Sequence, residues 1–180
     1  MEFTQNHFEL FELPVSFDIN QQDLAERYRD LQRALHPDKF ANASDRERRL
    51  SVQRAAQVNE AFQTLKSSMR RARYMLQIEG VEFDDEKDTS LDPMFLMEQM
   101  ELREALAEIR DSDDPLNQLT KIMTDIRDRT RDMESQLQQL FAENTSESHL
   151  QAKGIVQKMQ FLQRLQQEAE ELEEELMNSL

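Results

Sequence analysis

Cysteine and tryptophan are absent from this 180-residue chain, which contains only two glycines and four prolines. Without cysteine there is no disulfide framework, no thiolate metal site and no thiol nucleophile. The scarcity of turn-forming residues, the 33% of charged residues and the lack of any β-branched run of strand length all favour helices over strands. The composition therefore predicts an all-α fold.

Further absences narrow the class of protein. The three histidines, His7, His36 and His149, lie too far apart in the sequence for a local metal motif, so we expect no bound metal and no other cofactor. No apolar run is long enough to span a bilayer, and the N-terminus lacks the basic-then-apolar order of a signal peptide. No signature places a histidine or carboxylate pair for catalysis. We expect a soluble, cytoplasmic protein that is not an enzyme.

The formal net charge of -15 is distributed unevenly along the chain. Residues 1–76 carry twelve Lys/Arg and eleven Asp/Glu, whereas residues 77–180 carry ten and twenty-six. Between the two halves, residues 79–90 lose helical periodicity and include one of the two glycines. We therefore expect a domain at 1–76, a linker at 77–91 and a second domain at 92–180. The acidic balance argues against nonspecific nucleic-acid binding, which depends on Lys and Arg.

The N-terminal half contains two apolar stripes at helical spacing. Positions i, i+4, i+7 and i+11 of the first stripe are Leu24, Tyr28, Leu31 and Leu35. The second stripe runs from Ala55 to Leu76 in steps of three and four residues. Two such helices bury their stripes by packing against each other in an antiparallel hairpin, with the connecting loop displayed at one end.

Local signals set the limits of this predicted hairpin. Asn20 is a suitable N-cap for the first helix, and Pro37 must end that helix. The second helix is expected to begin near Ser44 or Asp45. Before the hairpin, residues 3–17 contain many phenylalanines and leucines, and we expect this segment to cover the two helices.

The loop of the hairpin carries the tripeptide His36-Pro37-Asp38. By itself such a tripeptide is often only a proline-initiated turn. Here it follows Tyr28 and Leu31, it precedes Lys39 and Phe40, and a second helix with the sequence VNEAFQTL at 58–65 comes after it. This combination, which covers roughly the first 75 residues, resembles a J domain.

The resemblance implies a domain that docks on a DnaK-type ATPase chaperone and accelerates ATP hydrolysis there. Proline stiffens the loop, while the carboxylate and the imidazole offer polar contacts to the partner. The residues expected to bind the chaperone are Arg29, Arg33, His36, Pro37, Asp38 and Lys39. For the arginines a purely solvated face is an equally good interpretation. Asp30 lies where many J domains have a basic residue, which dilutes the basic face.

The C-terminal half shows three further helical patterns. The first follows Asp92-Pro93 and ends before residues 111–115, the second continues to a break at residues 144–146, and the third extends from Ile155 to Leu176. Three long helices joined by short loops predict a three-helix bundle in which successive helices are antiparallel.

The first of these helices has more apolar residues than its packing requires. At about 100° per residue and with Phe95 at zero, Leu96, Met100 and Met97 lie at about 100°, 140° and 200°. The same outward side carries carboxylates at about 180°, 220° and 240°, from Glu104, Glu108 and Glu101. An apolar cluster bordered by carboxylates on a solvated face is typical of a binding surface, and methionine adapts readily to a partner.

Other interpretations of this cluster stay open. The linker or the N-terminal domain could pack over it, or it could be the self-contact of a helical homo-oligomer. Phe161, one position off the stripe of its own helix, either widens the cluster or belongs to the core.

The segment FLMEQMELRE at 95–104, placed shortly after a J domain, resembles the HscB family of co-chaperones, and with it the similarity spans nearly the whole chain. The resemblance implies that the bundle binds an iron-sulfur scaffold protein of the IscU type and delivers it to a chaperone of the HscA type, in support of iron-sulfur cluster assembly. Its implied client-binding residues are Leu96, Met97, Met100, Glu101, Glu104, Glu108 and Phe161. A generic J-domain co-chaperone with another client is the alternative.

Overall fold

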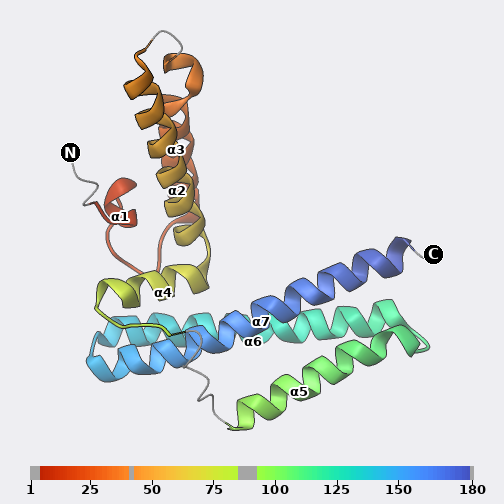
Figure 1. Ribbon diagram of the computed structural model, residues 1–180. Coiled ribbons are helices and arrows are strands. Elements are labelled where there is room, and N and C mark those ends of the chain that lie inside the picture. The colour runs from red at the N-terminus through yellow and green to blue at the C-terminus, as the bar shows by residue number, and fades with distance from the viewer. Residues whose placement is uncertain (1–4, 41–42, 85–92, 179–180) are drawn as a thin grey trace. The chain divides into compact units, whose positions relative to one another are not determined.

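The computed structural model describes residues 5–40, 43–84 and 93–178, except for the side chains of Pro37 and Asp111. The chain divides into two compact units, Met1–Ile78 and Glu79–Leu180. Every regular element in the described ranges is a helix (Figure 1), which confirms the all-α prediction. Residues 85–91 of the predicted linker and the predicted helix start at Asp92 lie outside the described residues.

The first unit is built on an antiparallel pair, α2 (Gln21–Leu35) and α3 (Asp45–Lys66), as Figure 1 shows. Its other elements are α1 (His7–Leu10), the 3-10 turn η1 (Pro37–Phe40) and α4 (Ser68–Ile78). Asn20 caps α2 by accepting hydrogen bonds from the backbone N–H groups of Gln22 and Asp23, and Ser44 forms a capping box with Glu47 at the start of α3. Both predicted helix starts are therefore confirmed.

The second apolar stripe belongs to two helices, and the prediction of one continuous helix is wrong. Ser67 adopts an extended conformation with φ -85° and ψ 123°, and it separates α3 from α4. Arg71 explains how the break is stabilised, because its guanidinium donates to the backbone oxygens of Leu65 at the end of α3 and of Phe17 in the loop before α2. A carbonyl left open by the end of a helix is thereby satisfied.

The N-terminal segment covers the helical pair as expected, although residue 3 lies outside the described part. Phe8, Phe11 and Phe17 are buried in a core with Leu24 and Leu65. On the α2–α3 contact, the Tyr28 and Phe62 rings stack with centroids 3.9 Å apart. The Tyr28 hydroxyl donates to Asn59 and accepts from the Gln32 amide. Stacking and hydrogen bonds of this kind fix the register of the two helices.

We expect Arg71→Met to destabilise the first unit. The side chain of Arg71 is only 6% exposed, and its Nε lies 2.8 Å from the Phe17 oxygen. Removing it leaves two buried carbonyls without this donor, which costs about 2–4 kcal/mol. Both tyrosines, Tyr28 and Tyr74, lie in this unit and the chain has no tryptophan, so tyrosine fluorescence during urea unfolding measures its stability selectively. The exposed neighbour change Arg70→Met is the control, and equal midpoints for the two variants would contradict this role of Arg71.

His7 makes the stability of the same unit dependent on pH. Its ring stacks on Tyr74 with centroids 4.1 Å apart, and burial lowers the pKa of His7, an effect that the Glu60 carboxylate only partly offsets. Because the unfolded chain binds this proton more tightly, stability is lost as the pH falls through about 6.5. We expect the thermal unfolding midpoint of His7→Phe to fall less than that of the wild type when the pH is lowered from about 7.5 to about 5.5. The phenylalanine keeps an aromatic ring on Tyr74. Equal losses would refute this assignment.

The described part of the second unit contains α5 (Pro93–Glu108), the 3-10 turn η2 (Ile109–Asp111), α6 (Pro115–Glu143) and α7 (Ser146–Asn178). Asp114 caps α6 by accepting from the N–H of Asn117, and Asn144 ends it in the left-handed conformation with φ 50°. These three long helices form the predicted bundle (Figure 1).

All three long helices contribute to an apolar cluster in the core of the bundle. Its fully buried members include Leu119 from α6 and Leu162 and Leu165 from α7. Phe95, near the start of α5, contacts Phe161 in the middle of α7. Arg110, just after the end of α5, forms an ion pair with Glu175 near the end of α7. Residue numbers therefore increase in the same direction along both helices. Helices α5 and α7 are therefore parallel, with α6 running the opposite way. This arrangement leaves the outer side of α5 open to a partner.

Candidate functional sites

The His36-Pro37-Asp38 loop lies at the end of α2 and begins the η1 turn. The backbone N–H of Asp38 donates to Nδ1 of His36 at 3.3 Å, and the same nitrogen lies 3.4 Å from Oδ2 of Asp38. The Asp38 side chain is nevertheless 89% exposed. The imidazole and the carboxylate are therefore held beside each other on a short turn and face water, where a partner can reach both.

The basic residues near the loop have different surroundings. Arg29 donates to the backbone oxygen of Ala25, whereas Arg33 forms an ion pair with Asp30. Asp30, which departs from the usual basic pattern, thus offsets part of the charge of Arg33. Lys39 is exposed on η1, and the side chain of Pro37 lies outside the described residues.

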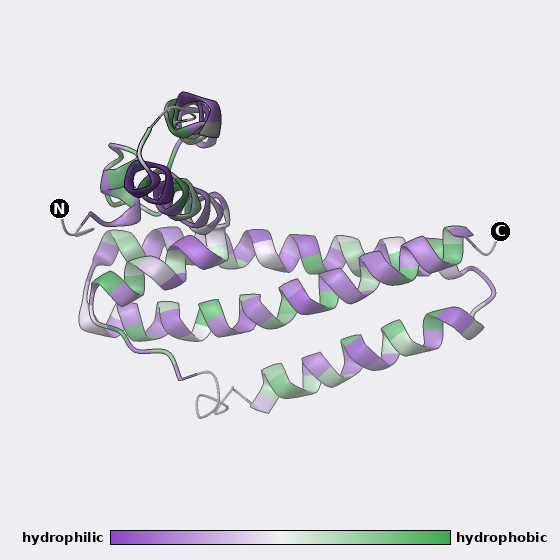
Figure 2. Cartoon of the chain, turned by 45° about the horizontal axis from the view of Figure 1, so that its top comes forward, coloured by the Kyte–Doolittle hydropathy of each residue, from purple (hydrophilic) through white to green (hydrophobic). Residues whose placement is uncertain are grey.

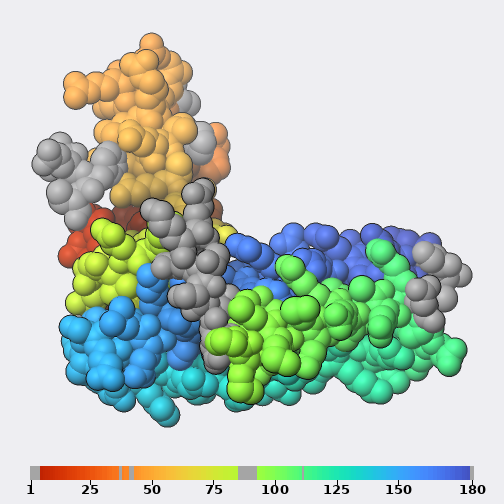
Figure 3. Space-filling view, turned by 60° about the horizontal axis from the view of Figure 1, so that its bottom comes forward, coloured from red at the N-terminus to blue at the C-terminus, as the bar shows by residue number. Residues whose placement is uncertain are grey.

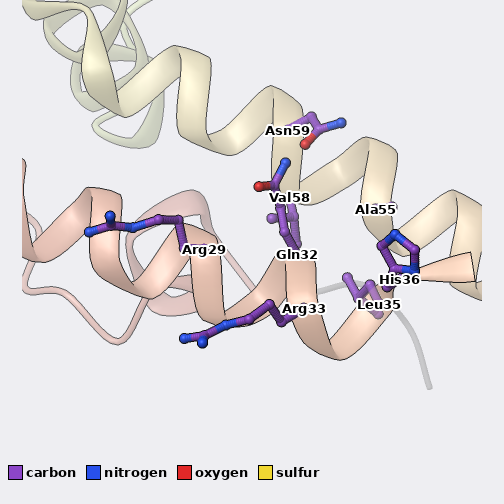
Figure 4. Close-up of a pocket in the computed structure, with 8 residues that line it drawn as sticks. All are labelled: Arg29, Gln32, Arg33, Leu35, His36, Ala55, Val58 and Asn59. Atoms are coloured by element: carbon purple, nitrogen blue, oxygen red, sulfur yellow. The ribbon is translucent and has the colours of Figure 1, made fainter. Parts of the chain in front are cut away.

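A groove of about 630 Å³, lined by residues of both α2 and α3, lies next to the loop. Its apolar wall is formed by Leu35, Ala55 and Val58, and its polar lining consists of Arg29, Gln32, Arg33, His36 and Asn59. Figure 4 shows Gln32 and Val58 between the two helices, with the side chains of Arg29 and Arg33 extending away from α3. The groove joins the loop to two of the predicted arginines in one continuous surface.

The predicted cluster on α5 is exposed, as the helical spacing indicated. Leu96, Met97 and Met100 are 42%, 64% and 63% exposed, while Phe95 and Leu106 on the inner side are buried. Hydrophobic and hydrophilic residues alternate along α5 in Figure 2, and Figure 3 shows this helix (light green) on one face of the bundle. We call Leu96, Met97 and Met100 the α5 patch.

The other residues predicted for this surface divide into two groups. Glu101, Glu104 and Glu108 are exposed and border the α5 patch. Phe161 is half-buried, since its ring packs edge-to-face on Phe95 at 5.8 Å and the Arg103 guanidinium lies 5.5 Å from its centroid. Phe161 therefore packs against the core of the bundle, and its contribution to the α5 patch stays a prediction.

Two negative findings apply to the described part of the molecule. No three His, Asp or Glu side chains come close enough there to hold a metal ion. Among the helices in those ranges, none combines the length and the apolar character needed to cross a membrane.

Two family models match the chain, one for each unit. The DnaJ domain model matches residues 6–74, and the model of the HSCB C-terminal oligomerisation domain matches residues 91–170. A co-chaperone protein HscB homolog from Shewanella halifaxensis is 46% identical over 173 residues, which cover 96% of this chain and 99% of the relative. The chain belongs to the HscB family of co-chaperones.

Solved HscB structures agree with this assignment. Chaperone HscB from Vibrio cholerae matches 96% of this chain and 99% of its own length with a TM-score of 0.85 at 41% identity. The human co-chaperone HscB also gives a TM-score of 0.85, at 27% identity over 94% of this chain and 83% of its own. The J domain followed by a helical bundle is thus the fold of an HscB co-chaperone.

Sequence reasoning missed several residues of the two surfaces of this HscB co-chaperone. In the groove beside the loop these are Gln32, Ala55, Val58 and Asn59. On the bundle they are the two cations that lie over aromatic rings, Arg103 and Lys158. The angular position of Arg103, at about 80° on the same wheel, placed it beside the α5 patch, but its contact depends on where α7 lies.

Proposed function

We propose that this chain is an adaptor that binds an iron-sulfur scaffold protein of the IscU type through the α5 patch and presents it to an HscA-type chaperone. The His36-Pro37-Asp38 loop contacts the chaperone and stimulates its ATPase. The chain itself performs no chemistry, because ATP is hydrolysed on the partner.

The observation that carries the proposal is the exposed α5 patch in a chain that also displays the His36–Asp38 pair. Exposed apolar clusters framed by charge are typical of protein-binding surfaces, and water-facing methionines have no packing role that would account for them. Arg29, Arg33 and Lys39 are suited to steer the loop toward an acidic surface of the chaperone. Because both surfaces belong to one chain, binding of the scaffold raises its effective concentration at the chaperone.

The proposal is tested by the steady-state ATPase rate of an HscA-type chaperone. We expect the full chain to raise this rate, and the chain together with the scaffold to raise it further than either protein does alone. Absence of stimulation by the chain would contradict the role of the loop. Stimulation without any effect or binding of the scaffold would leave the J-domain role intact and assign another client.

One observation favours a second function for the patch. The family model that matches residues 91–170 is that of an oligomerisation domain. If the α5 patch is a self-contact, Leu96→Ala combined with Met97→Ala will convert a dimer to a monomer in analytical ultracentrifugation. We expect the wild-type chain and this double variant to have the same mass in solution.

A further inference from the structure

Two cations lie over the ring pair at the edge of the α5 patch. The Arg103 guanidinium carbon is 5.5 Å from the centroid of Phe161, and Nζ of Lys158 is 5.1 Å from the centroid of Phe95. The two rings are themselves in edge-to-face contact at 5.8 Å. Cations at these distances are attracted to the face of an aromatic ring. One edge of the patch is therefore positively charged.

The opposite edge of the patch is negatively charged. With Phe95 at zero, Arg103 lies at about 80° on α5, Leu96 and Met100 at about 100° and 140°, and the three carboxylates between about 180° and 240°. Helix α7 contacts α5 on the Arg103 side, since Phe161 belongs to α7. Helix α6 contacts the other side through the ion pair of Arg129 with Glu98 at 3.1 Å. Across the open face of α5, the Arg103 cation therefore comes first, the apolar side chains of Leu96 and Met100 follow, and the three carboxylates come last.

The cationic edge is short. Further along the chain, Ala107 of α5 and Arg110 of η2 line a groove of about 410 Å³ together with Arg103. Helix α7 contributes Glu168 and Glu171 to the opposite wall of this groove. Arg110 pairs with Glu175 across this groove. Positive charge on the α7 side is therefore concentrated at the level of Arg103 and Lys158, beside Leu96 and Met100.

We propose that this charge order selects the client and fixes its orientation, with Arg103 as a specificity-determining residue. The complementary surface has an apolar centre, a carboxylate that meets Arg103, and Lys or Arg side chains that meet Glu101, Glu104 and Glu108. This inference rests on the proposed function, in which the α5 patch binds the scaffold protein. Docking in the reversed orientation would oppose like charges on both edges, which is strongly unfavourable.

The geometry of Arg103 suits such a contact. A guanidinium that is attracted to a ring through its positive charge keeps N–H donors available for a carboxylate. The side chain of Arg103 is exposed, so a partner can approach those groups. Lysine cannot reproduce the bidentate contact that a guanidinium makes with a carboxylate.

The test compares affinities of full-chain variants for a cluster-free IscU-type scaffold protein by isothermal titration calorimetry. We expect Arg103→Glu to weaken binding at least about tenfold, because it opposes a carboxylate of the client. Arg103→Lys should weaken binding less than Arg103→Glu does. The control is Arg127→Glu, the same charge change at an exposed position of α6, about 200° around that helix from Arg129.

Charge reversal in the client separates recognition from a structural role of Arg103. The scaffold is changed one residue at a time, each exposed Asp or Glu to Lys. We expect one of these scaffold variants to bind the Arg103→Glu chain as the wild-type pair binds. The same scaffold variant should not restore binding to the Glu104→Arg chain. If Arg103 only supports the Phe161 ring, no change in the client restores binding, and that result would overturn the inference.

Failure of the inference is distinguishable from failure of the proposed function. If Arg103→Glu binds as tightly as Arg127→Glu while Leu96→Ala with Met100→Ala loses the scaffold, the charge order is wrong and the α5 patch remains the client surface. If the Leu96 and Met100 variant binds normally, the proposed function itself fails.

Discussion

Asp38→Asn is expected to abolish stimulation of the chaperone ATPase and to leave the fold intact. The carboxylate is almost fully exposed and contributes no packing, so its loss does not destabilise the J domain. It removes a charged acceptor at the position that we propose contacts the chaperone, and a hydrogen bond to a charged group contributes about 1.5–3 kcal/mol. The stimulated rate should fall at least about tenfold, toward the basal rate of the chaperone. His36→Gln should have the same effect.

A matched control for this change lies at the other end of the same helix. Asp18 is also exposed and lies just before α2, whereas Asp38 lies just after it. The 15 residues of α2, about 22 Å of helix, separate the two carboxylates. Asp18→Asn should stimulate as the wild type does. Full stimulation by a folded Asp38→Asn protein, with the same unfolding midpoint by tyrosine fluorescence, would exclude the loop from the contact.

The triple change Leu96→Ala, Met97→Ala and Met100→Ala is expected to remove binding of the scaffold protein. All three side chains are exposed in the free chain, so truncation creates no cavity and the bundle keeps its stability. In the complex that we propose they form the apolar centre of the interface, where a few such residues provide most of the affinity. A total loss of about 3 kcal/mol corresponds to a dissociation constant about 100-fold higher.

The controls for the triple change are other exposed apolar residues of the bundle. Leu150 and Met177 are 66% and 63% exposed near the two ends of α7, and changing both to alanine removes exposed apolar surface away from the α5 patch. We expect their variant to bind the scaffold normally in calorimetry. Equal affinity of the triple variant and the wild type would show that the client binds elsewhere.

Local signals in the sequence predicted most of the fold because they act over a few residues. Asn20 and Ser44 start their helices, and Asn144 ends α6, through contacts with their own neighbours. The break at Ser67 was not predictable in this way, since the apolar spacing continues across it and neither proline nor glycine marks it. It depends on Arg71 reaching Phe17, a contact between segments 54 residues apart.

The two candidate surfaces show the same difference between features set by one helix and features set by packing. Exposure of the α5 patch followed from the helical wheel, because a single helix determines which side faces the core. The cations over Phe95 and Phe161 depend on how α7 packs beside α5, which no single helix determines. For the same reason the groove beside His36, which α2 and α3 form together, appears only in three dimensions.

In the proposed mechanism one chain must hold both partners at once. Mixing two full-length variants tests it most directly, one with Asp38→Asn and an intact α5 patch, the other with the triple patch change and an intact loop. The scaffold is kept at a concentration below its dissociation constant for this chain. We predict that the mixture then does not reach the ATPase rate of the wild-type chain, because neither variant links the scaffold to the chaperone. A mixture that restored the full wild-type rate would show that the two partners need not be held by the same chain.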